Sequence, residues 1–328
     1  MSVTIKDIAN MAGVSYSTVS KALNDSPLVK ESTKRKIVRI AEEMGYTPNY
    51  AAQKLVSKKT QVIGLIWPTI ERVVLSTLVT EISNVIRQTP YSMILSVDPV
   101  STSLKTFERF QVDGIILFEE KNDHTKFKTD IPLLSYGVGG QMEVNHPVID
   151  PNHEQAMYKA VEYLAGLGHT FIVYIGDVSD NDFLQMEKYR GFKKAMREFR
   201  LPVDENNFID SNGLGWYDGY RAVNQLLERE IQPTAIIGAS YEISSGIIRG
   251  IKENKLDIPH DISVISLDNV PQMANLEVPL TCIGVPIDEL AGEIAHSVIN
   301  FIESEEQEPF VKKMTPKLTK RNSCVVRK

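Results

Sequence analysis

Four polar side chains recur at helical spacing in the stretch AGVSYSTVSKALN, residues 12–24. One side of the predicted helix is polar and carries Tyr16, Ser17, Ser20 and Lys21. The opposite side is apolar and carries Val19, Ala22 and Leu23. Hydroxyl and ammonium groups can bind base edges in a DNA major groove, which is wide enough to admit a helix. Because most helices also show polar residues to solvent, the neighbouring elements must decide between these two interpretations.

The segment before this helix predicts a second helix that meets it at a sharp angle. Thr4 is an expected N-cap for a helix over about 5–12, and Gly13 can take the left-handed conformation that ends it. Ser15 is the expected N-cap of the helix with the polar face, which Asn24 closes. Since only two or three residues separate the helices, the arrangement predicted is a helix-turn-helix.

Charge also distinguishes this part of the chain. The first 60 residues carry ten Lys/Arg and five Asp/Glu, a net charge of +5, whereas the remainder carries 26 and 37, a net charge of −11. A basic head on an acidic body is expected when one part of a chain meets a polyanion, although chance clustering of solvated charges gives the same count. With a third helix expected over roughly 32–44, these features favour a DNA-binding headpiece over residues 1–46.

The next segment, TPNYAAQKLVSKK, predicts a short connector over residues 47–59. Pro48 suits the first position of a helix, but a helix of eight or nine residues is not stable alone in water. One interpretation is a helix supported by its copy and a DNA minor groove, with Leu55 as a wedge between base pairs. The other is a flexible linker in which Leu55 covers the body.

Residues 60–328 alternate short apolar runs with longer helical patterns. The runs are VIGLIW, YSMILSV, VDGIILF, PLLSYG, FIVYIG, PTAIIGA and ISVISLD. Such runs, separated by helices, predict two lobes that each hold a parallel sheet covered on both faces. Ligands in such folds bind beyond the carboxyl ends of the strands. The residues at those ends are 68–72, Gly137, 240–242, Asp268 and Asn269.

Patterns typical of catalysis or of cofactor binding are missing from the sequence. The glycine-rich stretches lack dinucleotide or P-loop spacing, and no Ser or Cys lies in a nucleophile motif. The six histidines and two cysteines show no metal-ligand spacing. No apolar signal core or run of about 18 apolar residues occurs. We therefore expect a cytoplasmic protein that is not an enzyme and has no cofactor, metal or membrane partner.

Taken together, these segments resemble the lac-repressor family of transcription regulators. TIKDIANMAGVSYSTVSKALN and GYTPNYAAQKL resemble the family's headpiece and hinge, and VDGII, YLAGLGH, YRGFKKAM and ISVISLDN resemble its effector-binding core. The resemblance implies an all-α helix-turn-helix headpiece and an α/β core of two doubly wound parallel-sheet lobes, similar to periplasmic binding proteins. It implies a first lobe of about 61–160 and 288–318, and a second lobe of about 161–287 and 319–328.

The resemblance also implies roles for individual residues. Those expected to contact operator DNA are Thr4, Ser15, Tyr16, Ser17, Ser20, Lys21, Asn24, Asn49, Ala52 and Leu55. Those expected to bind a small effector, a sugar or sugar derivative, are Glu71, Arg72, Arg190, Trp216, Ser240 and Asp268. The implied assembly is a homodimer, since no leucine-heptad tail follows CVVRK. The function implied is repression of carbohydrate-utilisation genes under effector control.

Three positions depart from the family's pattern. Ser240 is followed by Tyr241 where the family often has Asp, and Trp216 lies two residues beyond the usual aromatic position. Glu71 and Arg72 either mark an unusual effector or form a surface ion pair. A corepressor or a partner protein, as in catabolite control, is an alternative form of regulation. A sugar-binding transport component is a further alternative that the body alone would support.

Overall fold

The computed structural model describes residues 3–23, 25–46, 59–118, 129–138, 145–179, 182–229, 232–305 and 308–327. Two compact units make up the chain, Met1–Thr60 and Gln61–Lys328, and each is described by itself. The predictions for Asn24, Asn49, Ala52 and Leu55 lie outside the described residues. Within the described part, no helix is long and apolar enough to cross a bilayer.

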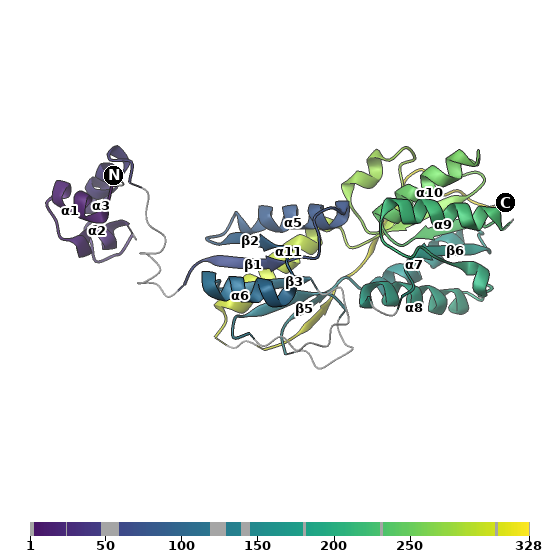
Figure 1. The fold of residues 1–328 in the computed structure, drawn as a ribbon, viewed down its shortest axis with the longest axis horizontal. Helices are drawn as coiled ribbons and strands as arrows, with labels where there is room; N and C mark the ends of the chain where they lie inside the picture. The colour runs from purple at the N-terminus through teal and green to yellow at the C-terminus, as the bar shows by residue number, and fades with distance from the viewer. Residues whose placement is uncertain are drawn as a thin grey trace. The chain divides into compact units, whose positions relative to one another are not determined.

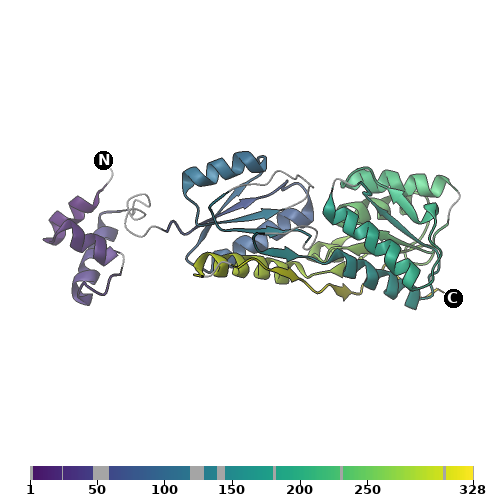
Figure 2. The same ribbon diagram turned by 90° about the horizontal axis from the view of Figure 1, so that it is seen from below.

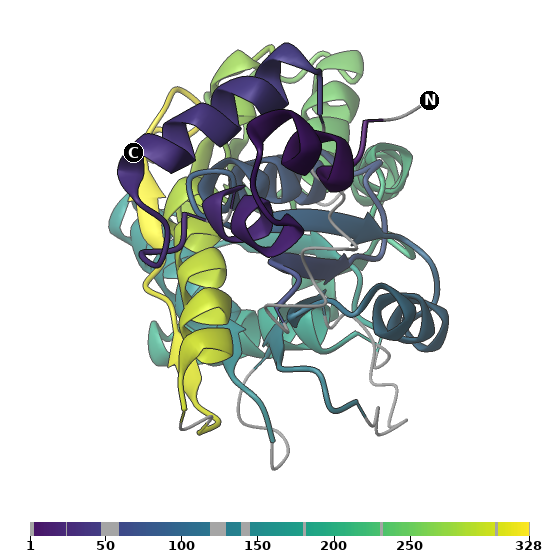
Figure 3. The ribbon, with the colours of Figure 1, turned by 90° about the vertical axis from the view of Figure 1, so that its left-hand side faces the viewer.

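In the described part of the first unit, three helices form a bundle (Figures 1 and 3). They are α1 (Ile5–Ala12), α2 (Tyr16–Leu23) and α3 (Glu31–Glu43). Their shared core consists of Ile8, Ala9, Ala12, Val19, Ala22, Val29, Ile37 and Ala41. The predicted helices over 5–12 and 32–44 are thus confirmed to within one residue at each end.

Local hydrogen bonds explain why these helices begin and end where they do. The backbone N–H and the hydroxyl of Thr4 both donate to Asp7 Oδ2, at 2.9 and 2.7 Å, which fixes the first turn of α1. Gly13 ends α1 with φ +69°. The N–H of Thr18 donates to Ser15 Oγ at 3.2 Å, so Ser15 caps α2 as predicted.

The second unit holds two lobes, each with a six-stranded sheet between helices (Figures 1 and 2). In the first lobe the strand order is β11-β5-β4-β3-β1-β2. These strands are β1 (Val62–Ile66), β2 (Ser92–Ser96), β3 (Gly114–Phe118), β4 (Leu133–Tyr136), β5 (Val148–Asp150) and β11 (Val311–Lys313). The covering helices are α5 (Val73–Ile86), α6 (Val100–Phe110) and α11 (Ile287–Glu303), with α6 on the face opposite α11 (Figure 2).

In the second lobe the strand order is β12-β10-β9-β8-β6-β7. These strands are β6 (Ile172–Gly176), β7 (Phe208–Asp210), β8 (Ala235–Gly238), β9 (Ser263–Leu267), β10 (Thr281–Gly284) and β12 (Lys317–Thr319). The helices form two pairs, α7 (His153–Gly166) with α8 (Phe183–Glu198) and α9 (Trp216–Glu228) with α10 (Tyr241–Glu253). Short 3-10 helices, η1 (Glu205–Asn207) and η2 (Pro271–Asn275), complete it.

The described strand pairs are parallel, except that β12 is antiparallel to β10. β3, β6 and β9 are buried along their whole length, as expected of strands covered on both faces. The predicted doubly wound architecture is therefore confirmed.

The chain passes between the lobes three times, before α7, before α11 and before β12. Because α7 packs on α8 and on strands of the second sheet, the first lobe's initial segment ends near residue 150. The predicted boundary at residue 160 is wrong, and so is the placement of residues 317–318 in the first lobe. The three-residue strand β5 is too short to be recognised in the sequence, so the crossing that follows it could not be predicted. The apolar pattern of a helix also does not indicate which sheet the helix covers.

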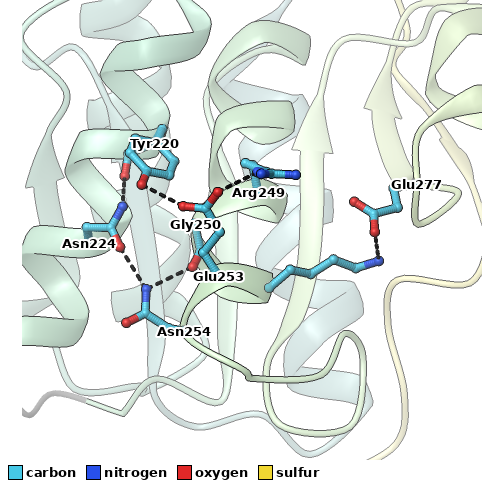
Figure 4. Close-up of polar contacts among 8 residues, drawn as sticks. Tyr220, Asn224, Arg249, Gly250, Glu253, Asn254 and Glu277 are labelled. Carbon is cyan, nitrogen blue, oxygen red and sulfur yellow. Dashed lines mark hydrogen bonds and ion pairs between the residues drawn. The ribbon is translucent and has the colours of Figure 1, made fainter.

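Helices α9 and α10 approach unusually closely. A methyl group at Gly246 would meet the backbone of Trp216 and Tyr220, so only glycine fits there. A polar network spans the same pair (Figure 4): Tyr220 Oη donates to Glu253 Oε2 at 2.6 Å, and Asn254 Nδ2 donates to Asn224 Oδ1 at 2.7 Å.

Replacing Gly246 with alanine should lower the free energy of unfolding by about 1 to 3 kcal/mol, because the helices must move apart. Gly292→Ala in α11 is the matched control, since its methyl group meets no atom within 4 Å. The control should be neutral or should stabilise by about 0.5 to 1 kcal/mol. Urea denaturation measures both values, and a Gly246→Ala protein as stable as the wild type would contradict the close packing.

Candidate functional site

Helix α2 presents the polar face that the sequence predicts. Tyr16, Ser17 and Lys21 are exposed and Ser20 is half-buried, whereas Val19 and Ala22 are buried in the headpiece core. Tyr16 leaves 54% of its surface accessible, a large value for an aromatic residue in a domain this small. Since the core takes only the apolar side of α2, the other side is available to a partner.

A second concentration of functional groups lies where the two lobes face each other. We call it the interlobe cluster, and it consists of Arg72, Tyr136, Asp150, His153, Glu187, Lys188, Glu242 and Asp268. Arg72, Tyr136 and Asp150 come from the first lobe, at the start of α5 and the ends of β4 and β5. The other five come from α7, α8, α10 and the residue after β9 in the second lobe.

Lys188 is the buried cation of this cluster. Its side chain is 4% exposed, and its ammonium group donates to the Ala239 carbonyl at 3.0 Å and to Gln185 Oε1 at 3.3 Å. Burial raises the pKa of Asp268, and the charges of Lys188 and then Arg72 oppose that rise. Lys188 therefore supplies positive charge inside the second lobe, close to a carboxylate at the lobe surface.

Asp268 has a strained backbone at the position where β9 ends. Its φ is +72°, which costs a non-glycine residue free energy, and such strain concentrates at functional sites. Its Oδ2 accepts a hydrogen bond from the N–H of Tyr241 at 3.2 Å. This arrangement holds the carboxylate at the carboxyl edge of the sheet, where ligands of such folds bind.

A pair of buried carboxylates lies at the first crossing between the lobes. Glu187 accepts from the N–H of His153 at 3.3 Å, and Asp150 Oδ1 accepts from the N–H of Asn152 at 2.7 Å. Burial, and then the charge of Asp150, raise the pKa of Glu187 to about 7. Lys313 partly offsets this, since its ammonium group lies 3.8 Å from Asp150 Oδ2.

Tyr136 and His153 are neutral groups within this field. Burial, followed by the charges of Asp268, Asp150 and Glu187, raises the pKa of Tyr136, so its hydroxyl keeps its proton and can donate. Burial, and then the charge of Lys188, hold the pKa of His153 well below its usual range. The cluster thus offers several acceptor oxygens and fixed donors, the combination that suits a ligand with many hydroxyl groups.

A cavity of about 30 Å³ opens beside the cluster, between the lobes. It is lined by Val74, Tyr136, Pro151, His153, Asp268, Asn269, Gly284, Val285, Ile287 and Leu290. This volume holds about one water molecule, so the lobes or their side chains must move to admit a sugar.

Two family models match separate parts of the chain. Residues 4–49 match bacterial regulatory proteins of the lacI family, and residues 161–324 match a periplasmic binding protein-like domain. Catabolite control protein A of Priestia megaterium is 30% identical over 335 residues, which cover 98% of this chain and 99% of that protein. The chain belongs to the lacI family of bacterial regulatory proteins.

Other similar proteins agree with this lacI-family assignment. The HTH-type transcriptional repressor PurR of Vibrio atlanticus is 27% identical, with 98% of each chain covered. A crystal structure of the lac repressor dimer bound to operator and the anti-inducer ONPF matches with a TM-score of 0.87 and 25% identity, over 99% of this chain and all of that one. This lacI-family chain is thus a DNA-binding transcriptional regulator with an effector-binding type of core.

The structure brings some of the predicted effector residues together and leaves others apart. Arg72 and Asp268 lie in the interlobe cluster, and Ser240 caps α10 beside it by accepting from the N–H of Ile243 at 3.3 Å. Glu71 is exposed next to Arg72. Trp216 is 45% exposed, and its ring stacks on Tyr220 of the same helix with centroids 5.5 Å apart.

Arg190 stays a predicted effector-binding residue. It is exposed on α8, whereas Lys188, two residues earlier, is buried against Ala239. Sequence reasoning missed Lys188, Glu187 and Tyr136, although Tyr136 precedes the strand-end residue Gly137 that it had selected. The apolar pattern of α8 could have indicated which of its charged residues point inward, since Leu184 and Phe192 lie four residues on either side of Lys188.

Among the predicted DNA-contacting residues that the structure describes, Thr4 and Ser15 make N-terminal capping hydrogen bonds. Both are nevertheless exposed at helix N-termini, which are favourable positions for binding phosphate. Their contacts with DNA stay a prediction, as do those of the polar face of α2.

Glu187→Gln should stabilise the core in a pH-dependent manner. The pKa of Glu187 is raised in the folded state, so folding resists its ionisation, and this cost grows as the pH rises from about 4.5 to about 7. Above pH 7 the variant should be more stable than the wild type by on the order of 3 kcal/mol, and near pH 4.5 the difference should vanish. Urea denaturation at several pH values measures this, with the exposed Glu198→Gln of the same helix as control. A difference that does not change with pH would contradict the assignment.

Proposed function

We propose that the protein is a homodimeric, sequence-specific repressor of carbohydrate-utilisation genes, controlled by a sugar-like effector in the interlobe cleft. The observation that carries the proposal is the pairing of an exposed polar recognition face on α2 with a mixed-charge cleft between two lobes. The similarity to an operator-bound lac repressor dimer supports both the dimer and the DNA target.

The DNA-binding half rests on α2. Two headpieces of a dimer would place their α2 helices in successive major grooves of a palindromic operator. Tyr16 and Ser17 lie in the first turn and can reach base edges, while Lys21, one turn later, can reach a guanine acceptor or a phosphate. The connector over 47–58 and the wedge role of Leu55 enter as predictions from the sequence.

The effector-binding half rests on the interlobe cluster. Asp268 would accept hydrogen bonds from ligand hydroxyls, and Lys188 and the Tyr136 hydroxyl would donate to ligand oxygens. Arg72 extends the same set from the first lobe. Because the residues come from both lobes, a bound effector changes the free energy of bringing the lobes together.

That change is the basis of control. An effector that prefers one lobe arrangement by about 1 to 3 kcal/mol alters operator affinity about 5- to 150-fold, provided that the same rearrangement repositions the two connectors. A connector helix too short to be stable alone would make operator binding sensitive to such a displacement.

A second candidate is regulation through a corepressor or a partner protein, in the manner of catabolite control. It is favoured by the 30% identity to catabolite control protein A over nearly the whole chain. A thermal-shift screen of sugars, sugar acids and sugar phosphates on the full chain separates the two. A ligand that raises the melting temperature and weakens operator binding supports the inducer, whereas one that strengthens operator binding supports the corepressor.

Lys21→Ala should weaken binding to the specific operator by about 1 to 3 kcal/mol if Lys21 contacts a base. Binding to random DNA should change much less. The measurement is a fluorescence anisotropy titration at constant salt, with exposed Lys6→Ala in α1 as the matched loss of charge. An equal loss on specific and random DNA would assign Lys21 to a phosphate instead.

Lys188→Ala should reduce effector affinity about 10- to 100-fold, because a charge-assisted hydrogen bond is lost. Arg190→Ala should abolish the effector response without loss of operator binding, because the family resemblance assigns Arg190 to the effector oxygens. Calorimetric titration of the ligand found by the screen measures both. Retained effector affinity in Arg190→Ala would exclude its predicted ligand role.

A further inference from the structure

Helix α5 begins at the lobe interface without a side-chain cap of its own. Its N-cap position is Arg72, which makes no capping hydrogen bond to the first turn. Instead, the N–H of Val73 donates to Oε1 of Glu242 at 2.7 Å. Glu242 belongs to α10 of the second lobe, so the end of a first-lobe helix is capped from the opposite lobe.

A second hydrogen bond lies one turn further along α5. Gln272 of η2 in the second lobe donates from Nε2 to Thr77 Oγ1 at 3.0 Å. Val73 and Thr77 are four residues apart, so they share one face of α5. That face contacts the second lobe at two points. The first of them lies at the N-terminus of α5, where the positive end of the helix dipole favours a carboxylate.

Glu242 is also connected to Asp268 within the interlobe cluster. Asp268 Oδ2 accepts from the N–H of Tyr241, the residue directly before Glu242. Glu242 is buried, with 8% of its surface exposed. Burial, and then the negative charge of Asp268, raise the pKa of Glu242, while the hydrogen bond from Val73 and the charge of Arg72 lower it. The repulsion from Asp268 thus opposes keeping Glu242 ionised in this position.

We propose that Glu242 is a cross-lobe latch, a positioning residue that caps α5 in the closed core and is tightened when ligand hydroxyls donate hydrogen bonds to Asp268. The proposal rests on the function proposed above. Ligand hydroxyls donating to Asp268 reduce its repulsion of Glu242, so the Glu242 carboxylate holds Val73 more firmly. Lobe closure then follows cleft occupancy without the ligand having to bridge the lobes directly.

Amide hydrogen exchange at Val73, resolved to the single residue by mass spectrometry on the full chain, tests the latch. Glu242→Ala should accelerate exchange at Val73 at least tenfold, because this N–H loses its acceptor. Glu242→Gln keeps an acceptor oxygen and should stay within about threefold of wild type. Glu253→Ala is the matched control, since Glu253 lies on the same helix and bonds only within the α9–α10 network of Figure 4 among the described residues.

Asp268→Asn tests the coupling between Asp268 and the Glu242 cap. Asparagine can still accept from Tyr241, but it removes the negative charge, so exchange at Val73 should slow by about two- to tenfold. Unchanged exchange in Asp268→Asn would overturn the coupling. Unchanged exchange in Glu242→Ala, equal acceleration in Glu253→Ala, or a Glu242→Gln variant as fast as Glu242→Ala would overturn the latch.

The latch and the proposed function fail in different measurements. Exchange at Val73 requires neither DNA nor an identified effector, so it judges the latch alone. Operator binding by the wild-type chain judges the proposed function. A wild-type chain that binds no operator but protects Val73 through Glu242 would refute the function and retain the contact as a structural cap.

Discussion

Burial of charged side chains between the two lobes is the constraint on which the rest of this structure depends. Lys188 and Glu187 are almost fully enclosed, and a buried charge is costly unless opposite charges and hydrogen bonds compensate it. Here the charged groups are shared between lobes, since Arg72 and Asp150 come from one and Lys188 and Asp268 from the other. The free energy of the closed core therefore depends on which groups occupy the cleft, which gives the fold its sensitivity to a ligand.

The topology places these groups together. Parallel strands in both sheets end towards the crossings, so β4, β5 and β9 deliver Tyr136, Asp150 and Asp268 to one region. Three crossings join the lobes, and one buried apolar cluster contains residues of both. The headpiece has a separate core of aliphatic residues, and this core alone positions the polar face of α2.

Local signals made the headpiece predictable from sequence. Thr4, Gly13 and Ser15 act within one turn of themselves, so their types indicate where α1 begins and ends and where α2 begins. The long apolar strands were equally clear, and the rule about strand ends located Asp268 and residues 240–242. The short strands β5, β7, β10, β11 and β12 are not among the predicted apolar runs, because three or four residues rarely establish a period. Lys188 was not selected alongside Arg190, because both are cations on α8 and only packing against Ala239 decides which is buried.

The proposed regulation requires that the cleft and the DNA-binding face be coupled. Linkage requires that an effector and an operator alter each other's affinity by the same factor. The direct measurement is calorimetric titration of the ligand found by thermal shift, with and without a saturating operator fragment. The account predicts at least a fivefold difference between the two affinities, equal to the change in operator affinity that the ligand causes. Equal ligand affinities in the two titrations would contradict it.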